Sequence, residues 1–142
     1  MSILTFTNAP FIVIIHLVIT MKKDIKEKTL QYIPEDFDGV ILDLRNKLEH
    51  ICPKAEIIPV NKFWGKIDLD DKSVDMAVCL KLHKLGDINT SLGEIHRVLR
   101  DEGTFIACLK PSDNFRTVLK EKFDVNSYHT MGHYAYFEAQ KK

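Results

Sequence analysis

The sequence predicts an α/β domain of three layers: a mostly parallel sheet, helices on both of its faces, and a C-terminal antiparallel hairpin. Two continuous apolar runs, 75–80 and 104–109, have the length and composition of strands that are covered on both faces, as in a parallel sheet. Between these runs, apolar residues recur at helical spacing, at Leu92, Ile95, Val98 and Leu99. A helix of this kind is typical of the crossover that joins two neighbouring parallel strands.

The residues before this unit predict two further strands and two helical segments. Residues 24–33 carry apolar side chains at helical spacing and are followed by Pro34, which ends the helix. Apolar runs at 39–44 and 55–60 have strand length, and residues 46–51 between them have helical spacing. The order strand, helix, strand is that of a parallel sheet with crossovers.

The residues after 109 predict a last helix and the hairpin. Residues 114–122 repeat apolar side chains at helical spacing. The segments 125–130 and 133–139 then flank Met131 and Gly132, and the second segment alternates between apolar and polar side chains. Two such strands around a glycine-containing turn predict an antiparallel pair.

Length and composition indicate one domain without a strongly charged surface. The chain has 142 residues, of which 45% are hydrophobic, enough for one ordinary core. Its 20 basic and 20 acidic residues cancel and form no long run of one sign, so we expect no nucleic acid or anionic lipid partner. The cysteines, Cys52, Cys79 and Cys108, are widely spaced, and two of them lie in apolar runs. This usage favours a reducing, cytoplasmic compartment.

Residues 1–20 form an apolar extension whose status the sequence leaves open. The apolar run within it, 11–19, is far shorter than the roughly 20 residues needed to cross a bilayer, so we expect no membrane span. A signal peptide is disfavoured because no basic segment precedes the run. Two interpretations remain: an added strand that packs on the domain, or an extension upstream of a natural start at Met21, which we favour. The domain itself is then residues 21–142.

Three motifs follow one another in the second half of the chain. IDLDDKSVD, residues 67–75, matches the pattern L-P-F-P-D-N-S-F-D, and LHKL, residues 82–85, stands where L-H-H-L is common. EIHRVLRDEGTF, residues 94–105, matches E-I-x-R-V-L-K-P-G-G-x-F. In order and spacing these motifs resemble class I S-adenosylmethionine-dependent methyltransferases. The resemblance implies a Rossmann-like methyltransferase fold closed by an antiparallel strand, for which HYAYFEAQKK, residues 133–142, is the candidate.

The resemblance is abbreviated on the side that would bind the cofactor. The family has a glycine-rich turn after its first strand, whereas Arg45, Asn46 and Lys47 follow residues 40–44 here. Asn61 stands near the end of the second strand, where the family has an acidic residue that binds the ribose hydroxyls. The stretch from Val60 to Ile67 is also too short for the helix and third strand that are usual in this family. If the cofactor nevertheless binds, the resemblance implies that it is held by Leu44, Asn61, Leu80 and Lys81.

Two further residues are candidates for an interaction or polar site. His83 follows the central strand, at the edge where ligands bind in open α/β sheets; a structural residue at a helix start is the alternative. Trp64 is either a core residue or an exposed anchor for a partner. We expect no metal site, and we find no set of catalytic residues in the sequence.

These observations favour a degenerate methyltransferase-like domain that is a non-catalytic binding or regulatory module, with a protein partner and without S-adenosylmethionine. The alternative is an active, divergent S-adenosylmethionine-dependent methyltransferase with an unknown acceptor. A third possibility is a decayed gene product that folds without a function. More loosely, the chain resembles the amino-terminal domain of the anamorsin family of cytosolic iron–sulfur assembly proteins, which lacks the same glycines. That resemblance implies a protein-interaction domain.

Overall fold

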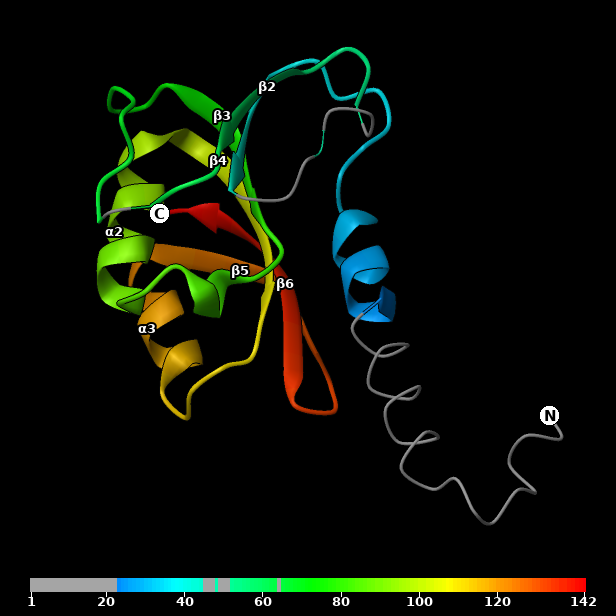
Figure 1. Ribbon diagram of the computed structural model, residues 1–142, viewed down its shortest axis with the longest axis vertical. Coiled ribbons are helices and arrows are strands. Elements are labelled where there is room, and N and C mark those ends of the chain that lie inside the picture. The colour runs from blue at the N-terminus through cyan, green and yellow to red at the C-terminus, as the bar shows by residue number, and fades with distance from the viewer. Residues whose placement is uncertain (1–22, 45–47, 49–51, 64) are drawn as a thin grey trace, which may run out of the picture.

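The computed structural model describes residues 23–44, 48, 52–63 and 65–142, which form a six-stranded sheet with helices on both faces (Figure 1). The strands are β1 (Val40–Leu44), β2 (Glu56–Val60), β3 (Val74–Cys79), β4 (Leu99–Leu109), β5 (Phe123–Met131) and β6 (Tyr134–Lys141). The labelled helices are α2 (Ile88–Val98), α3 (Phe115–Lys122) and the 3₁₀ turn η2 (Leu82–Lys84). A further helix covers residues 23–30. Within this part of the chain, no helix is long and apolar enough to cross a membrane.

The sheet is parallel on one side and antiparallel on the other. Its order is β2-β1-β3-β4-β6-β5. The first four of these strands pair in parallel, whereas β6 lies antiparallel between β4 and β5. A two-residue turn, Gly132 and His133, joins β5 to β6, and Gly132 takes a φ of 61°, which glycine adopts without steric cost. The predicted fold class, with its C-terminal hairpin, is therefore confirmed.

Alternate residues of each strand face opposite layers, as the pleat of a strand requires. Leu42 and Phe105 belong to the core cluster shared with α2 and α3. Their neighbours Ile41 and Ile106 belong to the cluster on the other face, together with Ile33 of the N-terminal segment. Figure 1 shows this arrangement, with α2 and α3 on one side of the sheet and the helix over residues 23–30 on the other.

The crossover between β3 and β4 follows the predicted pattern up to the end of its helix. Asp87 begins α2 as the N-cap, and its side chain accepts a hydrogen bond from the Thr90 N–H at 2.9 Å. The apolar stripe of the helix is buried: Leu92, Ile95 and Val98. Leu99 belongs to β4 instead of the helix, so this strand begins five residues earlier than the apolar run from residue 104 indicates.

Between β2 and β3, where the family that the sequence resembles has a helix and a third strand, residues 65–73 form neither helix nor strand. We call residues 65–73 the α2 strap, because they run along α2 and are bonded to it. The Ile67 N–H donates to the Glu94 carboxylate at 2.9 Å, and the Ser73 N–H donates to the Val98 carbonyl at 2.8 Å. Ile67 is fully buried in the core cluster on the α2 side. The strap thus closes that face of the sheet with far fewer residues than a helix and a strand would need.

Candidate binding site at the carboxyl edge of the sheet

A cavity of about 380 Å³ lies at the carboxyl ends of β3 and β4, against the helix over residues 23–30. We call it the edge cavity. Its basic lining residues are Lys26, Lys81, His83, Lys84 and Lys110. Its remaining lining residues are Ile25, Leu80, Cys108 and Tyr134. No carboxylate belongs to this lining among the residues that the structure describes.

The floor of the edge cavity is apolar and closely packed. Ile25, Leu80 and Cys108 form one buried cluster, and Tyr134 packs against it half-buried. The Cys108 thiol donates a hydrogen bond to the Leu80 carbonyl at 2.9 Å, which links the ends of β3 and β4. Burial raises the pKa of the Cys108 thiol, and a hydrogen bond with Thr29 and the ammonium groups of Lys26 and Lys81 oppose that rise only in part. Cys108 is therefore a protonated structural residue at neutral pH.

His83 connects the two strand ends on the rim of the cavity. It lies in η2, whose first residue, Leu82, is fully buried and holds the turn against the core. The His83 Nδ1 atom accepts a hydrogen bond from the Lys110 N–H at 3.0 Å. In the neutral ring the proton is then on Nε2, which is a donor. The imidazole thus determines the course of the chain beyond β4, where Lys110 enters the rim.

The side chains of the four lysines of the rim are exposed. Over the described ranges, none of Lys26, Lys81, Lys84 and Lys110 forms an ion pair, although lysines elsewhere do, such as Lys72 with Asp101 at 3.3 Å. Like charges gathered at one opening raise the local positive potential and attract anions. The lining of the edge cavity therefore produces a positive local potential.

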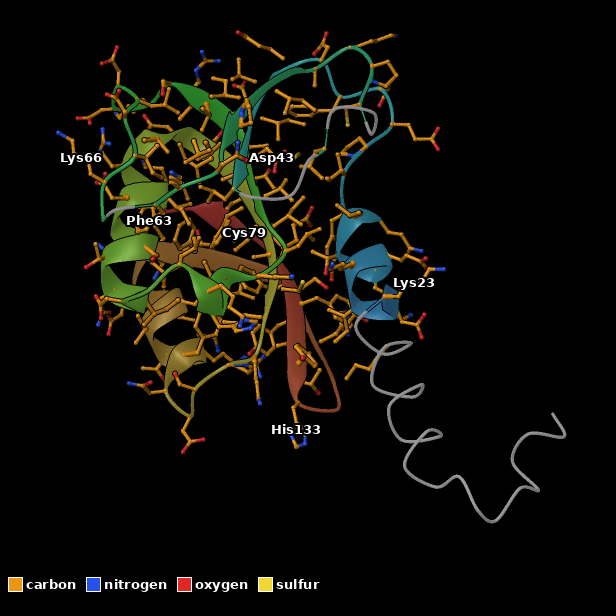
Figure 2. The ribbon with its side chains drawn as sticks, in the orientation of Figure 1. Lys23, Asp43, Phe63, Lys66, Cys79 and His133 are labelled. Carbon is orange, nitrogen blue, oxygen red and sulfur yellow. The ribbon has the colours of Figure 1, made fainter. Side chains whose placement is uncertain are left out.

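Asp43 lies near the carboxyl end of β1 (Figure 2). Its side chain is buried, and its carboxylate accepts a hydrogen bond from the Leu48 N–H at 2.8 Å. Leu48 is itself buried on the face of the sheet opposite α2. The Asp43 carboxylate thus fixes the position of the backbone at Leu48, a role that was not predicted from the sequence.

The structure brings together some of the predicted site residues and separates others. Leu80, Lys81 and His83 all line the edge cavity. Leu44 is instead buried in the core cluster on the α2 side, and Asn61 is exposed beyond β2; neither lines this cavity. Trp64 lies outside the residues that the structure describes, as do most residues of the predicted 46–51 helix and the glycine-free sequence at 45–47.

Sequence reasoning missed six lining residues: Ile25, Lys26, Lys84, Cys108, Lys110 and Tyr134. Only part of this set had a recognisable signal. Lys110 and Cys108 stand at the end of a predicted parallel strand, the position where ligands bind in open α/β sheets. Lys26 has no such signal, because it belongs to the N-terminal helix over residues 23–30, which is distant in sequence from the strands that end at the cavity.

The motif residues Glu94 and Arg97 serve the fold and lie away from the edge cavity. The Arg97 guanidinium donates to the Glu94 carboxylate at 2.9 Å, to the Ile67 carbonyl at 2.7 Å and to the Leu69 carbonyl at 2.8 Å. Glu94 and Asp71 raise the pKa of the Arg97 guanidinium. The described residues contain no group of three or more His, Cys, Asp or Glu side chains that could hold a metal ion.

Comparison with known proteins agrees with this fold. The sequence pattern of a methyltransferase domain family matches residues 24–107, more than half of the chain. The chain therefore belongs to the methyltransferase domain family, and the predicted resemblance to S-adenosylmethionine-dependent methyltransferases is confirmed. No curated protein sequence matches the chain.

Solved structures of methyltransferases share the fold at low sequence identity. An S-adenosylmethionine-dependent methyltransferase from Aquifex aeolicus has a TM-score of 0.63 at 15% identity, over 82% of this chain and 89% of its own. A putative methyltransferase from Haloferax volcanii, in complex with the Trm112 methyltransferase activator, has a TM-score of 0.62 at 11% identity, over 82% and 88%. The N-methyltransferase NodS from Bradyrhizobium japonicum, in complex with S-adenosylhomocysteine, has a TM-score of 0.60 at 10% identity, over 84% and 85%.

Proposed function

We propose that this chain is a methyltransferase-fold domain without methyl transfer activity, and that it is a binding or regulatory module that uses the carboxyl edge of its sheet. The observation that carries this proposal is the lining of the edge cavity, with four lysines and a histidine and no carboxylate among the described residues. A site of this charge suits an anion. The class of methyl donor that the family uses is cationic.

The charge of the cofactor argues against its binding in the edge cavity, which contains Leu80 and Lys81 of the expected contacts but not Leu44 or Asn61. S-adenosylmethionine carries a sulfonium and an ammonium group against one carboxylate, so its net charge is positive. A cation that enters a cavity lined by four lysines is repelled by each of their ammonium groups. No acidic side chain of the described lining offsets that repulsion.

The strand ends add two further arguments. The Asp43 carboxylate accepts a hydrogen bond from the Leu48 N–H, so one of its oxygens already has a partner within the fold. Asn61 offers an amide where a carboxylate would accept two donors from a ribose. The sequence also has no glycine between Gly39 and Gly65, although a backbone that approaches a cofactor closely needs one.

A second candidate function is an active, divergent S-adenosylmethionine-dependent methyltransferase. Membership of the methyltransferase domain family favours it, as does the S-adenosylhomocysteine complex of the structurally similar NodS. In that case Leu44, Asn61 and the backbone around Leu80 and Lys81 would hold the cofactor, which supplies the methyl group. The buried position of Leu44 limits its part to backbone contacts.

Titration calorimetry separates the two candidates. The purified chain is titrated with S-adenosylmethionine and with S-adenosylhomocysteine, which lacks the sulfonium charge, and the melting temperature is measured at saturating ligand. The binding module predicts no binding tighter than about millimolar and no rise in melting temperature for either compound. Micromolar binding of either would refute the non-catalytic proposal and would direct attention to methyl acceptors.

A protein partner and a cytoplasmic location remain predictions from the sequence. The Haloferax volcanii methyltransferase, which forms a complex with an activator protein, provides a precedent for partner binding by this fold. The looser resemblance to the anamorsin family also implies a protein-interaction domain. Affinity capture with the wild type and with Trp64→Ala tests whether Trp64 is the anchor: the variant should lose a partner that the wild type retains.

A further inference from the structure

The edge cavity combines a concentrated positive charge with an apolar floor, and its parts come from distant segments of the chain. Lys26 comes from the helix over residues 23–30, Lys81 and Lys84 from the η2 region, and Lys110 from the chain after β4. Within the part of the chain that the structure describes, none of the four has an ion-pair partner. Four ammonium groups around one opening repel one another, and a bound anion removes that repulsion.

We propose that the edge cavity binds a phosphate-bearing small molecule with an aromatic or apolar body, such as a nucleoside monophosphate. This inference rests on the proposed function, because it assigns a ligand class to the same binding site. A phosphate monoester carries about −1.5 to −2 charges at neutral pH and presents three acceptor oxygens. It can therefore meet several lysines at once, whereas a carboxylate brings a single charge. Lysine binds phosphate as a compact point charge with three donors.

The floor of the cavity accounts for the body of the ligand. Ile25, Leu80 and Cys108 line the cavity and form one buried hydrophobic cluster, and the half-buried Tyr134 adds an aromatic ring. A volume of about 380 Å³ lies within the range of roughly 300–1,000 Å³ that is usual for small-molecule sites. Inorganic phosphate alone would leave most of this volume and the whole apolar floor unused.

His83 supports the phosphate side of the cavity by positioning the backbone at Lys110. Because its Nδ1 atom accepts the Lys110 N–H at 3.0 Å, the neutral ring has its donor at Nε2. His83 thus lines the cavity together with the four lysines and holds one of them, Lys110, in place through its backbone.

The test compares ligands that differ only in the phosphate. The wild-type chain is titrated with AMP, adenosine, phenyl phosphate, phenol and inorganic phosphate, each at low and at high salt. We expect AMP or phenyl phosphate to bind at least tenfold more tightly than its uncharged counterpart and than inorganic phosphate, and binding to weaken as salt rises. Equal binding of the charged and uncharged members, or no binding of AMP and phenyl phosphate at millimolar concentration, would overturn the inference.

Matched lysine variants locate the binding. Lys81→Gln and Lys110→Gln should each weaken the tighter-binding phosphate compound about tenfold, the loss of one charge-assisted contact, while Lys120→Gln on α3 should not change it. All three lysines are exposed, so the variants should retain the wild-type melting temperature. Amide NMR shifts on ligand addition should centre on Leu80 and Cys108. Shifts elsewhere, or undiminished binding by both cavity variants, would contradict the assignment.

The two proposals can fail independently. Micromolar binding of S-adenosylmethionine would refute the non-catalytic function whatever the phosphate compounds do. If neither the phosphate compounds nor S-adenosylmethionine bind, the proposed ligand class is refuted, whereas the non-catalytic function is still supported.

Discussion

Gly103 occupies a crowded position where the chain enters the main part of β4. A Cβ atom there would lie 2.8 Å from the Arg100 carbonyl oxygen and 3.2 Å from the Asp75 carbonyl oxygen. Both are backbone atoms, which cannot turn aside as the end of a side chain can. Glu102 before it has a φ of 63°, at a position where the family pattern has glycine. At this turn the residue type is thus determined by backbone geometry and close approach.

Substitution of two glycines tests this constraint. Gly103→Ala should lower the free energy of unfolding by about 1–3 kcal/mol, because the added methyl group forces the backbone apart. Gly93→Ala is the matched control: Gly93 lies inside α2, a Cβ there meets no atom within 4 Å, and alanine favours the helix by about 0.5–1 kcal/mol. Urea unfolding measures both. Equal effects of the two changes would contradict the crowding.

At the scale of elements, the α2 strap depends on two side chains of α2. Arg97 donates to the Ile67 and Leu69 carbonyls, and Glu94 accepts the Ile67 N–H, so the pair supplies the hydrogen bonds that a neighbouring strand would otherwise supply. Hydrogen bonds from Arg97 lower the pKa of the Glu94 carboxyl group, against the opposing effect of partial burial. The E-I-x-R motif thus has a structural meaning in this chain.

This arrangement predicts a pH-dependent contribution to stability. Because the folded-state pKa of Glu94 is lowered, its contribution is complete above the unfolded-state pKa, near 4.5, and is lost as pH falls through the folded-state value. Glu94→Gln should therefore lower the free energy of unfolding by about 1–2 kcal/mol at pH 7, and its difference from the wild type should shrink in acid. Urea unfolding at several pH values measures this difference.

Glu121→Gln is the control for the pH series, since Glu121 is an exposed residue on α3. It should leave stability within about 0.5 kcal/mol of the wild type at pH 7. A Glu94→Gln deficit that stays constant down to pH 3 would show that the contribution does not depend on the carboxylate charge.

Across the whole molecule, the two faces of the sheet are covered unequally. On the α2 and α3 face, Phe105 lies with its ring centroid 5.2 Å from those of Phe123 and Phe137, and Phe115 joins them at 5.8 Å from Phe137. On the other face of β6, Tyr136 is half-buried beside Tyr32, with ring centroids 6.3 Å apart. Among the residues that the structure describes, the largest buried apolar cluster therefore lies on the α2 and α3 face.

Neighbouring residues of β6 test this asymmetry. Phe137→Ala should lower the free energy of unfolding by about 3–5 kcal/mol, because it leaves a cavity among aromatic rings in the core. Tyr136→Ala, one residue away on the opposite face, should cost about 1–2 kcal/mol because its ring is already in part exposed. Denaturant unfolding of both variants measures the ratio, and similar losses would contradict the unequal layers.

Local patterns in the sequence predicted most of the elements. The apolar stripe of α2, the buried strands β3 and β4, and the alternating strand β6 all follow from periodicity within a single segment. Boundaries were less certain where one element passes directly into the next: Leu99 completes the apolar stripe of α2 by spacing, yet it begins β4 in the structure, opposite Val74. Periodicity alone cannot distinguish the last turn of a helix from the first residue of a strand.

By itself the sequence determined the fold class, the order of its elements, and the family, because each depends on spacing within short segments. Only the tertiary structure decided the path of the α2 strap, the bond between Asp43 and Leu48, and the composition of the edge cavity. Lys26 and Lys110 are far apart along the chain. Both line the edge cavity because the helix over residues 23–30 packs against the ends of β3 and β4. Such contacts arise from packing between layers, which no local pattern of residues records.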